Sequence, residues 1–530
     1  MWEYMRSRLS GHNRSQRNSL GGDGTSNGGG HSNAPSRATT VNFKDLNLLV
    51  GEDSESDEAP ESSCEERIHS NRQRRLKKVV KRNKLIIIMV GLPGRGKTFL
   101  CNKLVSYLNW LGHTTRHFNV GQYRRVMKDV TVVQDAAFFD HSNTAGREAR
   151  EKALLASLVD LTSWLDGDEG QVAIFDATNT TEERRQFLIS KFHGKFQYMF
   201  IESICNDEEV LEQNYRYKMM YSPDYQNVST EEALRDFKDR IKYYQAVYEP
   251  INDRKHHYIK LIDMVTGRGH LDVNRISGYI SGKIVFFLMQ ICKAGMMQSR
   301  KIWLTRHGES EYNRLKLLGG DSALSPKGEE YARCLPDLLF NRLPLTFQDE
   351  PVPLSVWTST LKRTIQTAEH LPFPKMRWKA IDEIDAGICD GMTYKEVQET
   401  MPEEFEARRK DKLKYRYPSG ESYLDVIQRL EPVIVEMERE RECICVVGHQ
   451  AILRAIYGYF MKVPLQEIPN IEVPLHTLLE LTPMPDGTMS EEIIQLEVRT
   501  PPSSPPPVPP VRWFMGTPPV QMPAGAGSLS

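Results

Sequence analysis

Short apolar runs alternate with helix-length segments along the middle of the chain. β-Branched, strand-like runs stand at Leu85–Val90, Val172–Phe175 and Tyr198–Glu202. Segments with the mixed polarity of surface helices, Thr98–Leu111 and Arg147–Leu165, lie between them. Strands that alternate with helices of this length are typical of βαβ units in a parallel sheet. The pattern therefore predicts an α/β domain with a mostly parallel sheet.

A second series of the same kind occupies the other half of the chain. Strand-like runs occur at Lys301–Arg306, Val356–Thr358 and Cys443–Val447, with helical stretches between them. The motifs of the two halves have nothing in common, so they are not an internal repeat. We expect two α/β domains in tandem, at residues 85–298 and 299–497, with the joint near residues 290–300.

The two ends lack the apolar residues that a folded core needs. Within residues 1–84, residues 1–50 are rich in Gly, Ser and Asn, residues 51–66 form an acidic block, and residues 72–84 form a basic block. Residues 498–530 are rich in proline. Such segments bury too little apolar surface to offset the entropy of ordering them, so both ends are predicted to be disordered tails.

A regulatory role for these tails is the alternative. Ser54 and Ser56 lie among acidic residues and are candidate sites for a protein kinase, as is Ser504 before a proline. The run Pro507-x-x-Pro510-x-Arg512 fits the groove of an SH3-type partner.

Charge and cysteine usage exclude several classes of protein. The chain has 69 Lys and Arg against 70 Asp and Glu, a net charge of −1, which disfavours a nucleic-acid binder. The densest apolar run is too short to span a bilayer, and no signal-peptide core is present at the N-terminus, so no membrane association is expected. The 8 cysteines are widely scattered and do not form a disulfide framework. We therefore expect a reducing compartment and a cytoplasmic protein.

A glycine-rich loop follows the first strand-like run. Its sequence GLPGRGKT matches G-x-x-x-x-G-K-[ST], whose backbone N–H groups surround a phosphate. Lys97 would neutralise the β- and γ-phosphates, and Thr98 would ligate the Mg²⁺ of Mg·ATP. The predicted nucleotide-binding residues are Gly91, Leu92, Pro93, Gly94, Arg95, Gly96, Lys97 and Thr98.

Asp176 directly follows the strand-like run Val172–Phe175. An acid at the carboxyl end of a parallel strand faces the ligand site, where it can bind a metal or accept a proton. A carboxylate that merely ends the strand is the alternative. Arg184 and Arg185, and likewise Arg124 and Arg125, suit a phosphorylated substrate.

The second half carries the residues of a phosphohistidine site. Arg306-His307-Gly308 leaves a strand-like run, as in the histidine phosphatase superfamily, which it resembles. Arg363 offers a second arginine, His449 a second histidine and Glu383 an acid. A neutral imidazole can attack phosphorus, and a carboxylic acid can protonate the leaving alcohol. Surface charges and a core histidine are the alternative interpretation.

Longer strings resemble one family of bifunctional enzymes. FNVGQYRR, FDATNTT, IESICND, SPDY, RHGESEYN, GGDSALS, KRTIQTAE, EIDAG, YRYPSGESY and VGHQAILR are similar to 6-phosphofructo-2-kinase/fructose-2,6-bisphosphatase over about residues 85–495. The resemblance implies a P-loop kinase domain followed by a phosphoglycerate-mutase-like histidine phosphatase domain. It also implies synthesis of fructose 2,6-bisphosphate from fructose 6-phosphate and Mg·ATP, hydrolysis of that product without a metal cofactor, and a homodimer.

The resemblance assigns residues to both halves. In the kinase half it implies catalytic roles for Asp176 and Cys205, although Cys205 is equally explained as a small core residue. Asn214 matches a stretch that lines the nucleotide. The positions that match fructose 6-phosphate contacts are Arg124, Arg150, Thr178, Arg184, Arg240 and Tyr244. In the phosphatase half it implies His307 as nucleophile and Glu383 as proton donor. Arg306, Arg363 and His449 match the phosphate pocket, and the bisphosphate contacts are Arg306, Asn313, Gly319, Tyr394, Arg408, Lys412, Tyr423, Gln450 and Arg454.

Two positions depart from the family pattern. Met219 stands where the family has a lysine, with Lys218 one residue earlier, and Leu317 stands where an arginine is usual. A shift of one helical residue turns a side chain by about 100°, so either Lys218 reaches back or the contact is lost. Two alternatives to a bifunctional enzyme follow: a phosphatase-dominant member with a weakened kinase, and a non-enzymatic scaffold that uses the tails.

Overall fold

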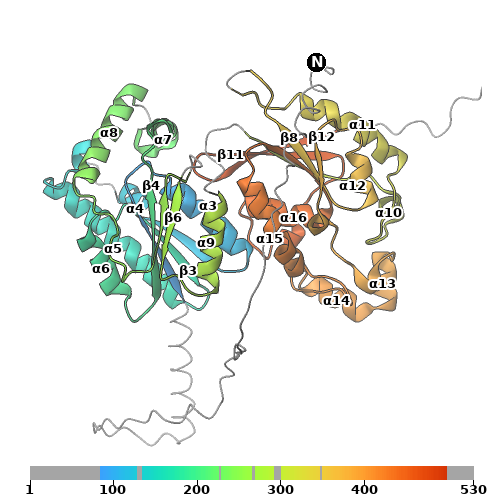
Figure 1. Cartoon of the computed structure of the whole chain (residues 1–530). Helices are drawn as coiled ribbons and strands as arrows, with labels where there is room; N and C mark the ends of the chain where they lie inside the picture. The colour runs from blue at the N-terminus through green and yellow to red at the C-terminus, as the bar shows by residue number, and fades with distance from the viewer. Residues whose placement is uncertain are drawn as a thin grey trace, which may run out of the picture. The chain divides into compact units, whose positions relative to one another are not determined.

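The computed structural model describes residues 84–127, 134–225, 228–264, 269–291, 300–346 and 349–497. Within them lie two six-stranded sheets, each accompanied by helices (Figure 1). The two predicted tails and most of the joint near residues 290–300 fall outside the described residues.

The first sheet has the strand order β2-β3-β1-β4-β5-β6. Every neighbouring pair is parallel except β5 and β6, which are antiparallel. The mostly parallel sheet is confirmed, and the pattern missed β2, β5 and β6. The strands are β1 (Leu85–Val90), β2 (Thr115–Asn119), β3 (Val172–Asp176), β4 (Gln197–Ile204), β5 (Tyr258–Ile262) and β6 (His270–Asn274).

Side-chain caps start most helices of this half. Asn119, Asn143, Thr181, Asp207 and Ser229 each accept a hydrogen bond from a backbone N–H of the first turn that follows. The helices are α3 (Lys97–Trp110), α4 (Val120–Val126), α5 (Thr144–Asp166), α6 (Glu182–Phe192), α7 (Glu208–Tyr221), α8 (Thr230–Ala246) and α9 (Tyr279–Ile291), with short 3₁₀ turns η2 (Ala136–Phe139) and η3 (Pro223–Tyr225).

The central strand β1 is buried along its whole length. Ile86 and Ile88 pack with Phe175 and Leu158 on one face, whereas Met89 packs with Leu104 on the other. This alternation is expected of a strand that is covered by helices on both faces. It explains why β1 has no polar position and why the polar residues of the site begin only after Val90.

The second sheet has the order β12-β11-β7-β10-β8-β9. Strands β7, β10, β8 and β9 are parallel, and β11 and β12 add an antiparallel edge that the pattern did not predict. The strands are β7 (Ile302–Arg306), β8 (Leu354–Thr358), β9 (Lys375–Arg377), β10 (Cys443–Gly448), β11 (Thr477–Pro483) and β12 (Met489–Gln495).

Capping boxes begin three helices of the second half. Ser310, Thr393 and Ser422 each exchange hydrogen bonds with the residue three positions later. The helices are α10 (Glu311–Leu315), α11 (Pro326–Phe340), α12 (Lys362–Thr367), α13 (Tyr394–Thr400), α14 (Pro402–Lys410), α15 (Tyr423–Arg439) and α16 (Gln450–Phe460), with 3₁₀ turns η5 (Lys379–Ile381), η6 (Gly387–Cys389) and η7 (Ile468–Asn470).

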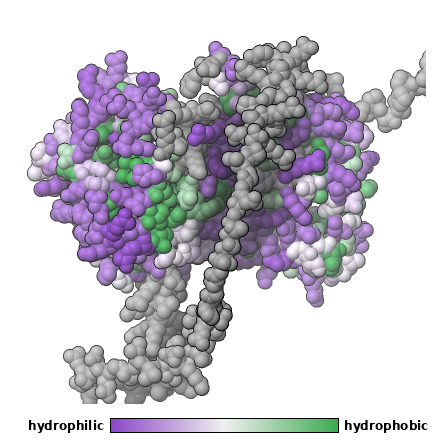
Figure 2. Space-filling model, in the orientation of Figure 1, coloured by the Kyte–Doolittle hydropathy of each residue, from purple (hydrophilic) through white to green (hydrophobic). Residues whose placement is uncertain are grey.

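The face of the molecule in Figure 2 is mostly hydrophilic, with smaller apolar patches. Most large apolar side chains of the described residues are buried in the cores of the two sheets. A search of the described helices finds none with the length and apolarity needed to cross a membrane.

Candidate active sites

The first site forms where β1 and β3 end. The two strands are parallel neighbours, with Ile88 opposite Phe175, so the loop after Val90 meets Asp176. Gly91 has φ +134°, and a Cβ there would lie 2.5 Å from the carbonyl oxygen of Ser203, so the loop requires glycine at this position. The backbone N–H of Gly91 donates to Thr178 O at 2.9 Å. The predicted loop and the predicted acid are therefore adjacent.

Lys97 and Thr98 open helix α3 at this edge. Lys97 Nζ donates to Leu92 O at 2.7 Å, and burial lowers the pKa of its ammonium to about 8. Thr98 Oγ1 donates to Asp176 Oδ2 at 2.9 Å. A cation, a hydroxyl and a carboxylate thus surround the start of a helix, whose free N–H groups also attract phosphate.

Asp176 is the most heavily bonded acid of this site. Its Oδ2 accepts from Thr98, from His117 Nε2 at 3.1 Å and from Asn119 Nδ2 at 2.9 Å. Burial raises the pKa of Asp176, but the hydrogen bonds and charges of His117, Lys97 and Thr98 outweigh it and the net shift is downward. Asp176 is therefore ionised at neutral pH. His117 was missed by the sequence analysis because β2 was not recognised as a strand.

Asn214 and Cys205 lie on the far side of the loop. Asn214 Nδ2 donates to Gly94 O at 3.2 Å, and Arg95 donates to Tyr215 Oη at 2.8 Å. Cys205 follows β4 and packs beside Tyr215 in a cluster of apolar side chains on α7 and α8. Burial raises the pKa of its thiol, so Cys205 is a neutral group at physiological pH.

A cluster of arginines surrounds Asp224, which belongs to the SPDY string. Arg124 donates to Asp224 Oδ2 at 2.7 Å, Arg240 lies 3.4 Å from the same oxygen, and Arg125 lies 3.7 Å from Oδ1. One carboxylate thus holds three guanidinium groups in place and neutralises only one of them. The surplus positive charge suits a phosphate group.

Phe139 joins the remaining sugar-phosphate candidates to this cluster. The guanidinium groups of Arg240 and Arg150 lie 3.7 Å and 6.0 Å from the centre of the Phe139 ring. The centre of the Tyr244 ring lies 5.9 Å from the same point. Arg184 lies within electrostatic range of Tyr244 and Arg150. The Nε of Arg240 is buried without a hydrogen-bond partner among the described residues. Buried polar groups normally have a hydrogen-bond partner, so this donor is available to an anionic ligand.

The structure distinguishes Lys218 from Met219. Met219 is buried among Leu211, Phe237 and other apolar side chains of α7 and α8. Lys218 is still accessible to solvent, yet partial burial and then the charges of Arg240 and Arg125 lower its pKa. Its ammonium therefore lies within electrostatic range of Arg240, Arg125, Asp176 and Asp224, whereas Met219 faces the core.

The second site forms where β7 and β10 end side by side. His307 follows β7 and donates its backbone N–H to Gly448 O at 3.0 Å, and His449 follows β10. The two imidazole rings lie 5.2 Å apart. Burial, reinforced by Arg363, lowers the pKa of both histidines well below the usual value, so both are neutral at physiological pH.

Hydrogen bonds fix the tautomer of each histidine. His307 Nδ1 lies 2.7 Å from Gly308 O and must donate to it, which leaves a lone pair on Nε2. Arg363 Nε donates to His449 Nδ1 at 3.2 Å, so His449 Nε2 carries the proton, 2.8 Å from Ser359 Oγ. His307 therefore presents a free nitrogen, which is the requirement for a nucleophile.

Two arginines supply the charge beside His307. Arg306 is mostly buried, which lowers its pKa to about 10, and Arg363 is also buried. The Nε of Arg306 has no hydrogen-bond partner among the described residues. Both sites thus hold a buried guanidinium with a free donor.

Glu383 lies at the N-terminus of α16. Its carboxylate accepts from the backbone N–H of Gln450 at 3.1 Å and of Ala451 at 3.2 Å. These bonds hold the carboxyl group at the mouth of the cavity that contains His307. An acid in this place can deliver a proton to a leaving oxygen.

A cavity of about 380 Å³ opens in front of His307. All the residues that the resemblance assigned to the bisphosphate line it, and His449 lies behind Arg363. The predicted residues in its wall are Arg306, His307, Asn313, Gly319, Arg363, Glu383, Tyr394, Arg408, Lys412, Tyr423, Gln450 and Arg454. Tyr415, Tyr417 and Lys316 also line it and were missed.

Leu317 lines this cavity as well, next to Lys316. Lys316 ends α10 in the left-handed conformation, with φ +57°. Lys316 and Leu317 both lie in the cavity wall at this turn. The cation Lys316 therefore stands one residue before the position where the resemblance leads us to expect an arginine. Both departures in the sequence thus place a lysine one residue before the expected basic position.

The two sites define the class of the protein: a P-loop phosphotransferase domain followed by a histidine phosphatase domain. Comparison with family models agrees, because residues 72–294 match 6-phosphofructo-2-kinase and residues 302–494 match branch 1 of the histidine phosphatase superfamily.

Similar proteins identify the family. The chain is 51% identical over 400 residues to an Arabidopsis thaliana 6-phosphofructo-2-kinase/fructose-2,6-bisphosphatase, with 75% of this chain and 52% of that protein covered. It is 45% identical to the human isoform 1, with 77% and 84% covered, and 44% identical to a Saccharomyces cerevisiae fructose-2,6-bisphosphatase, with 77% and 88% covered. The chain belongs to the 6-phosphofructo-2-kinase/fructose-2,6-bisphosphatase family of bifunctional enzymes.

The positions of Met219 and Lys218 predict opposite effects of substitution. Met219→Lys buries an ammonium in an apolar cluster and is expected to lower the free energy of unfolding by about 3–5 kcal/mol. Lys218→Ala is expected to change it by less than about 0.5 kcal/mol and to raise the KM of the phosphorylated acceptor about tenfold. Thermal unfolding and steady-state kinetics check both. Met219→Leu is the matched control and is expected to lower the free energy of unfolding by less than about 1.5 kcal/mol. A stable, more active Met219→Lys variant would refute this assignment.

Proposed function

We propose that this chain transfers the γ-phosphoryl group of ATP to the 2-hydroxyl of fructose 6-phosphate in its first site and hydrolyses fructose 2,6-bisphosphate in its second. The observation that carries the proposal is the pair of cationic sites, each at the end of parallel strands and each with a buried guanidinium Nε that has no partner among the described residues. Together the two activities would set the level of one signalling sugar in glycolysis and gluconeogenesis.

In the kinase half the residues divide into three groups. The loop from Gly91 to Gly96 and Lys97 bind the nucleotide phosphates, with Asn214 beside the loop. Asp176 orients or deprotonates the accepting hydroxyl, because it is an ionised carboxylate at the phosphate edge. The sugar-phosphate candidates Arg124, Arg150, Thr178, Arg184, Arg240 and Tyr244 bind the acceptor. Cys205 has no charged form to offer, so we assign it a packing role beside the loop.

Mg²⁺ is the metal proposed for this half. Thr98 Oγ1 and Asp176 Oδ2 lie 2.9 Å apart and are the hard oxygen donors that Mg²⁺ prefers. When bound with ATP, the ion would neutralise charge on the β- and γ-phosphates. Thr98 and Asp176 are the residues that would hold it.

In the phosphatase half, His307 attacks the 2-phosphate through Nε2. Its P–N bond forms as the P–O bond to the sugar breaks, and Glu383 donates a proton to the leaving sugar oxygen. Arg306 and Arg363 stabilise the charge on the transferred phosphoryl group, and His449 orients Arg363 through its Nδ1. The Glu383 carboxylate then takes a proton from water, which attacks phosphorus and breaks the P–N bond, so that inorganic phosphate leaves and both His307 and the Glu383 acid are restored. The cations farther along the cavity, Arg408, Lys412 and Arg454, bind the second phosphate. No metal is required in this scheme.

A phosphatase-dominant enzyme is the second candidate. The yeast relative bears a name that mentions the phosphatase alone. The kinase half of the present chain lacks a lysine at position 219. Against this candidate, Lys218 approaches the same arginine cluster. A non-enzymatic scaffold is disfavoured because Lys97, Asp176 and His307 all occupy their sites.

Three further features are proposals, and only the first of them rests on the family resemblance. We propose a homodimer, a cytoplasmic location, and partners of the SH3 or protein-kinase type for the tails. Sedimentation of the full chain, and fractionation of cells that express it, would test the first two.

Transfer of label from γ-labelled Mg·ATP to fructose 6-phosphate tests the proposed kinase. Labelled fructose 2,6-bisphosphate is the expected product, because the arginine cluster selects a phosphorylated acceptor. Folded protein that binds ATP but leaves the sugar unlabelled would contradict the kinase proposal and favour the phosphatase-dominant enzyme.

The two sites are expected to fail separately. Lys97→Ala should lower kinase kcat by about 100-fold or more, because it removes the cation beside the transferred phosphate, and leave the phosphatase intact. His307→Ala should lower phosphatase kcat by about 10⁴-fold or more and leave the kinase intact. Assays of both activities on each variant measure this. If either substitution abolished both activities in a folded protein, the model of two independent sites would be wrong.

Lys412 predicts a pH dependence of the phosphatase. Burial, and then Arg454 and Arg408, lower its pKa to about 8, so its positive charge is present below that pH and is lost above it. We expect phosphatase kcat/KM to fall about tenfold from about pH 7 to about pH 9 as a phosphate contact weakens. Lys412→Arg stays charged over this range and should flatten the decline. An equal decline in this variant would assign the titration to another group.

A further inference from the structure

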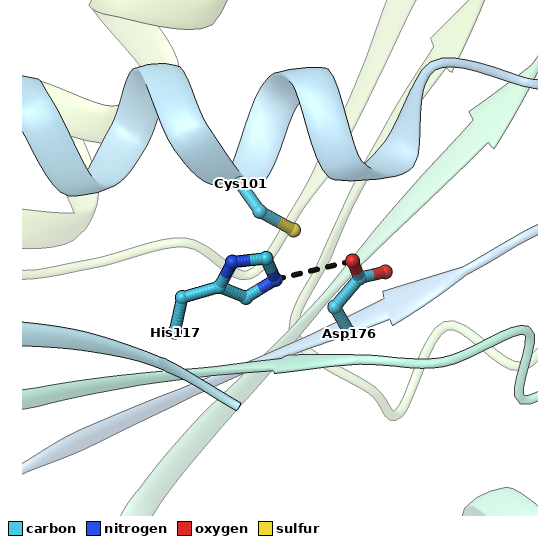
Figure 3. Close-up of side chains that lie close together, drawn as sticks. All are labelled: Cys101, His117 and Asp176. Atoms are coloured by element: carbon cyan, nitrogen blue, oxygen red, sulfur yellow. Dashed lines mark hydrogen bonds and ion pairs between the residues drawn. The ribbon is translucent and has the colours of Figure 1, made fainter. Parts of the chain in front are cut away.

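Three potential metal ligands converge beside the phosphate-binding loop. Cys101 lies on α3, His117 on β2, and Asp176 ends β3 (Figure 3). The sulfur of Cys101, a ring nitrogen of His117 and a carboxylate oxygen of Asp176 all lie within 4.8 Å of one another. Their side chains point into one space.

The distances suit a zinc-sized ion after a small contraction. Zn²⁺ binds nitrogen at about 2.0 Å and sulfur at about 2.3 Å, so neighbouring ligand atoms lie about 3–4 Å apart in a tetrahedral site. His117 Nε2 and Asp176 Oδ2 are already 3.1 Å apart. Thr98 Oγ1 lies 2.9 Å from the same oxygen and offers a further oxygen donor.

The ligand chemistry separates this site from that of Mg²⁺. A thiolate and an imidazole are softer than the oxygen ligands of Mg²⁺ and favour Zn²⁺ or Co²⁺. Cys101 and Asp176 are buried, and an ion with two positive charges would be neutralised by one thiolate and one carboxylate. The charge of the complex therefore suits its buried position beside Lys97.

We propose that Cys101, His117 and Asp176 form a site for a thiophilic divalent cation, Zn²⁺, which blocks the kinase half. Binding releases the thiol proton of Cys101 to solvent, and the proton that His117 Nε2 donates to Asp176 is replaced by the metal, with the ring proton on Nδ1. Asp176 then binds Zn²⁺ and is no longer available to the metal that accompanies the nucleotide. Inhibition rests on the proposed kinase function, whereas metal binding does not.

Titration of the metal-free full chain with Co²⁺ tests the site directly. One equivalent is expected to give the near-ultraviolet charge-transfer absorption of a cobalt–thiolate bond, which Zn²⁺ then abolishes by displacement. Cys101→Ser should lose this absorption and bind Zn²⁺ at least about tenfold more weakly. Cys334→Ser, which removes a partly buried thiol on α11, is the matched control and should retain both properties.

Activity gives a second readout. Zn²⁺ should inhibit phosphoryl transfer from Mg·ATP in the unmodified chain and in Cys334→Ser, and inhibit Cys101→Ser at least about tenfold less. The phosphatase of all three should be unaffected. Cobalt–thiolate absorption in Cys101→Ser, or its absence from the unmodified chain, would overturn the metal site. Absorption without a measurable kinase would leave the metal site standing and refute the proposed kinase instead.

Discussion

Both sites depend on one geometric constraint: parallel strands that pair in register end at the same edge of their sheet. The pairing of β1 with β3 brings the loop after Val90 to Asp176, and that of β7 with β10 brings His307 to His449. Strands β1, β3 and β10 are buried to their last residues, and β7 is buried up to Thr305, so the polar groups of each site begin at the ends of the strands or just beyond them. The same hydrophobic burial that stabilises each sheet therefore positions its chemistry.

Desolvation then sets the charge states in the two sites. It keeps His307 and His449 neutral, whereas Asp176 stays ionised because His117, Lys97 and Thr98 outweigh its burial. Burial dominates at His307, which is a neutral nucleophile, whereas hydrogen bonds and nearby charges dominate at Asp176, which is an ionised carboxylate. The excess of arginine and lysine around each group leaves charge for phosphate ligands to neutralise.

Much of the architecture was predictable from the sequence. The six apolar runs that it indicated are β1, β3, β4, β7, β8 and β10, and their carboxyl ends carry most of the expected site residues. Among the strands that were missed, β2 and β6 are half-exposed and their alternating pattern is weak. In contrast, β11 is mostly buried. Missing β2 also hid His117, which bonds Asp176 and completes the proposed metal site.

The sequence by itself determined the order of the two α/β domains, the phosphate-binding loop and the phosphohistidine motif, because each depends on residues that are close together in the chain. Tertiary structure alone decided which side chains of α7 face the site. Met219 enters the apolar cluster and Lys218 stays exposed within electrostatic range of the arginines, since the packing of α7 against α8 sets the rotation of the helix. It also decided that Cys101, His117 and Asp176 meet, because three separate elements must pack before their side chains share one space.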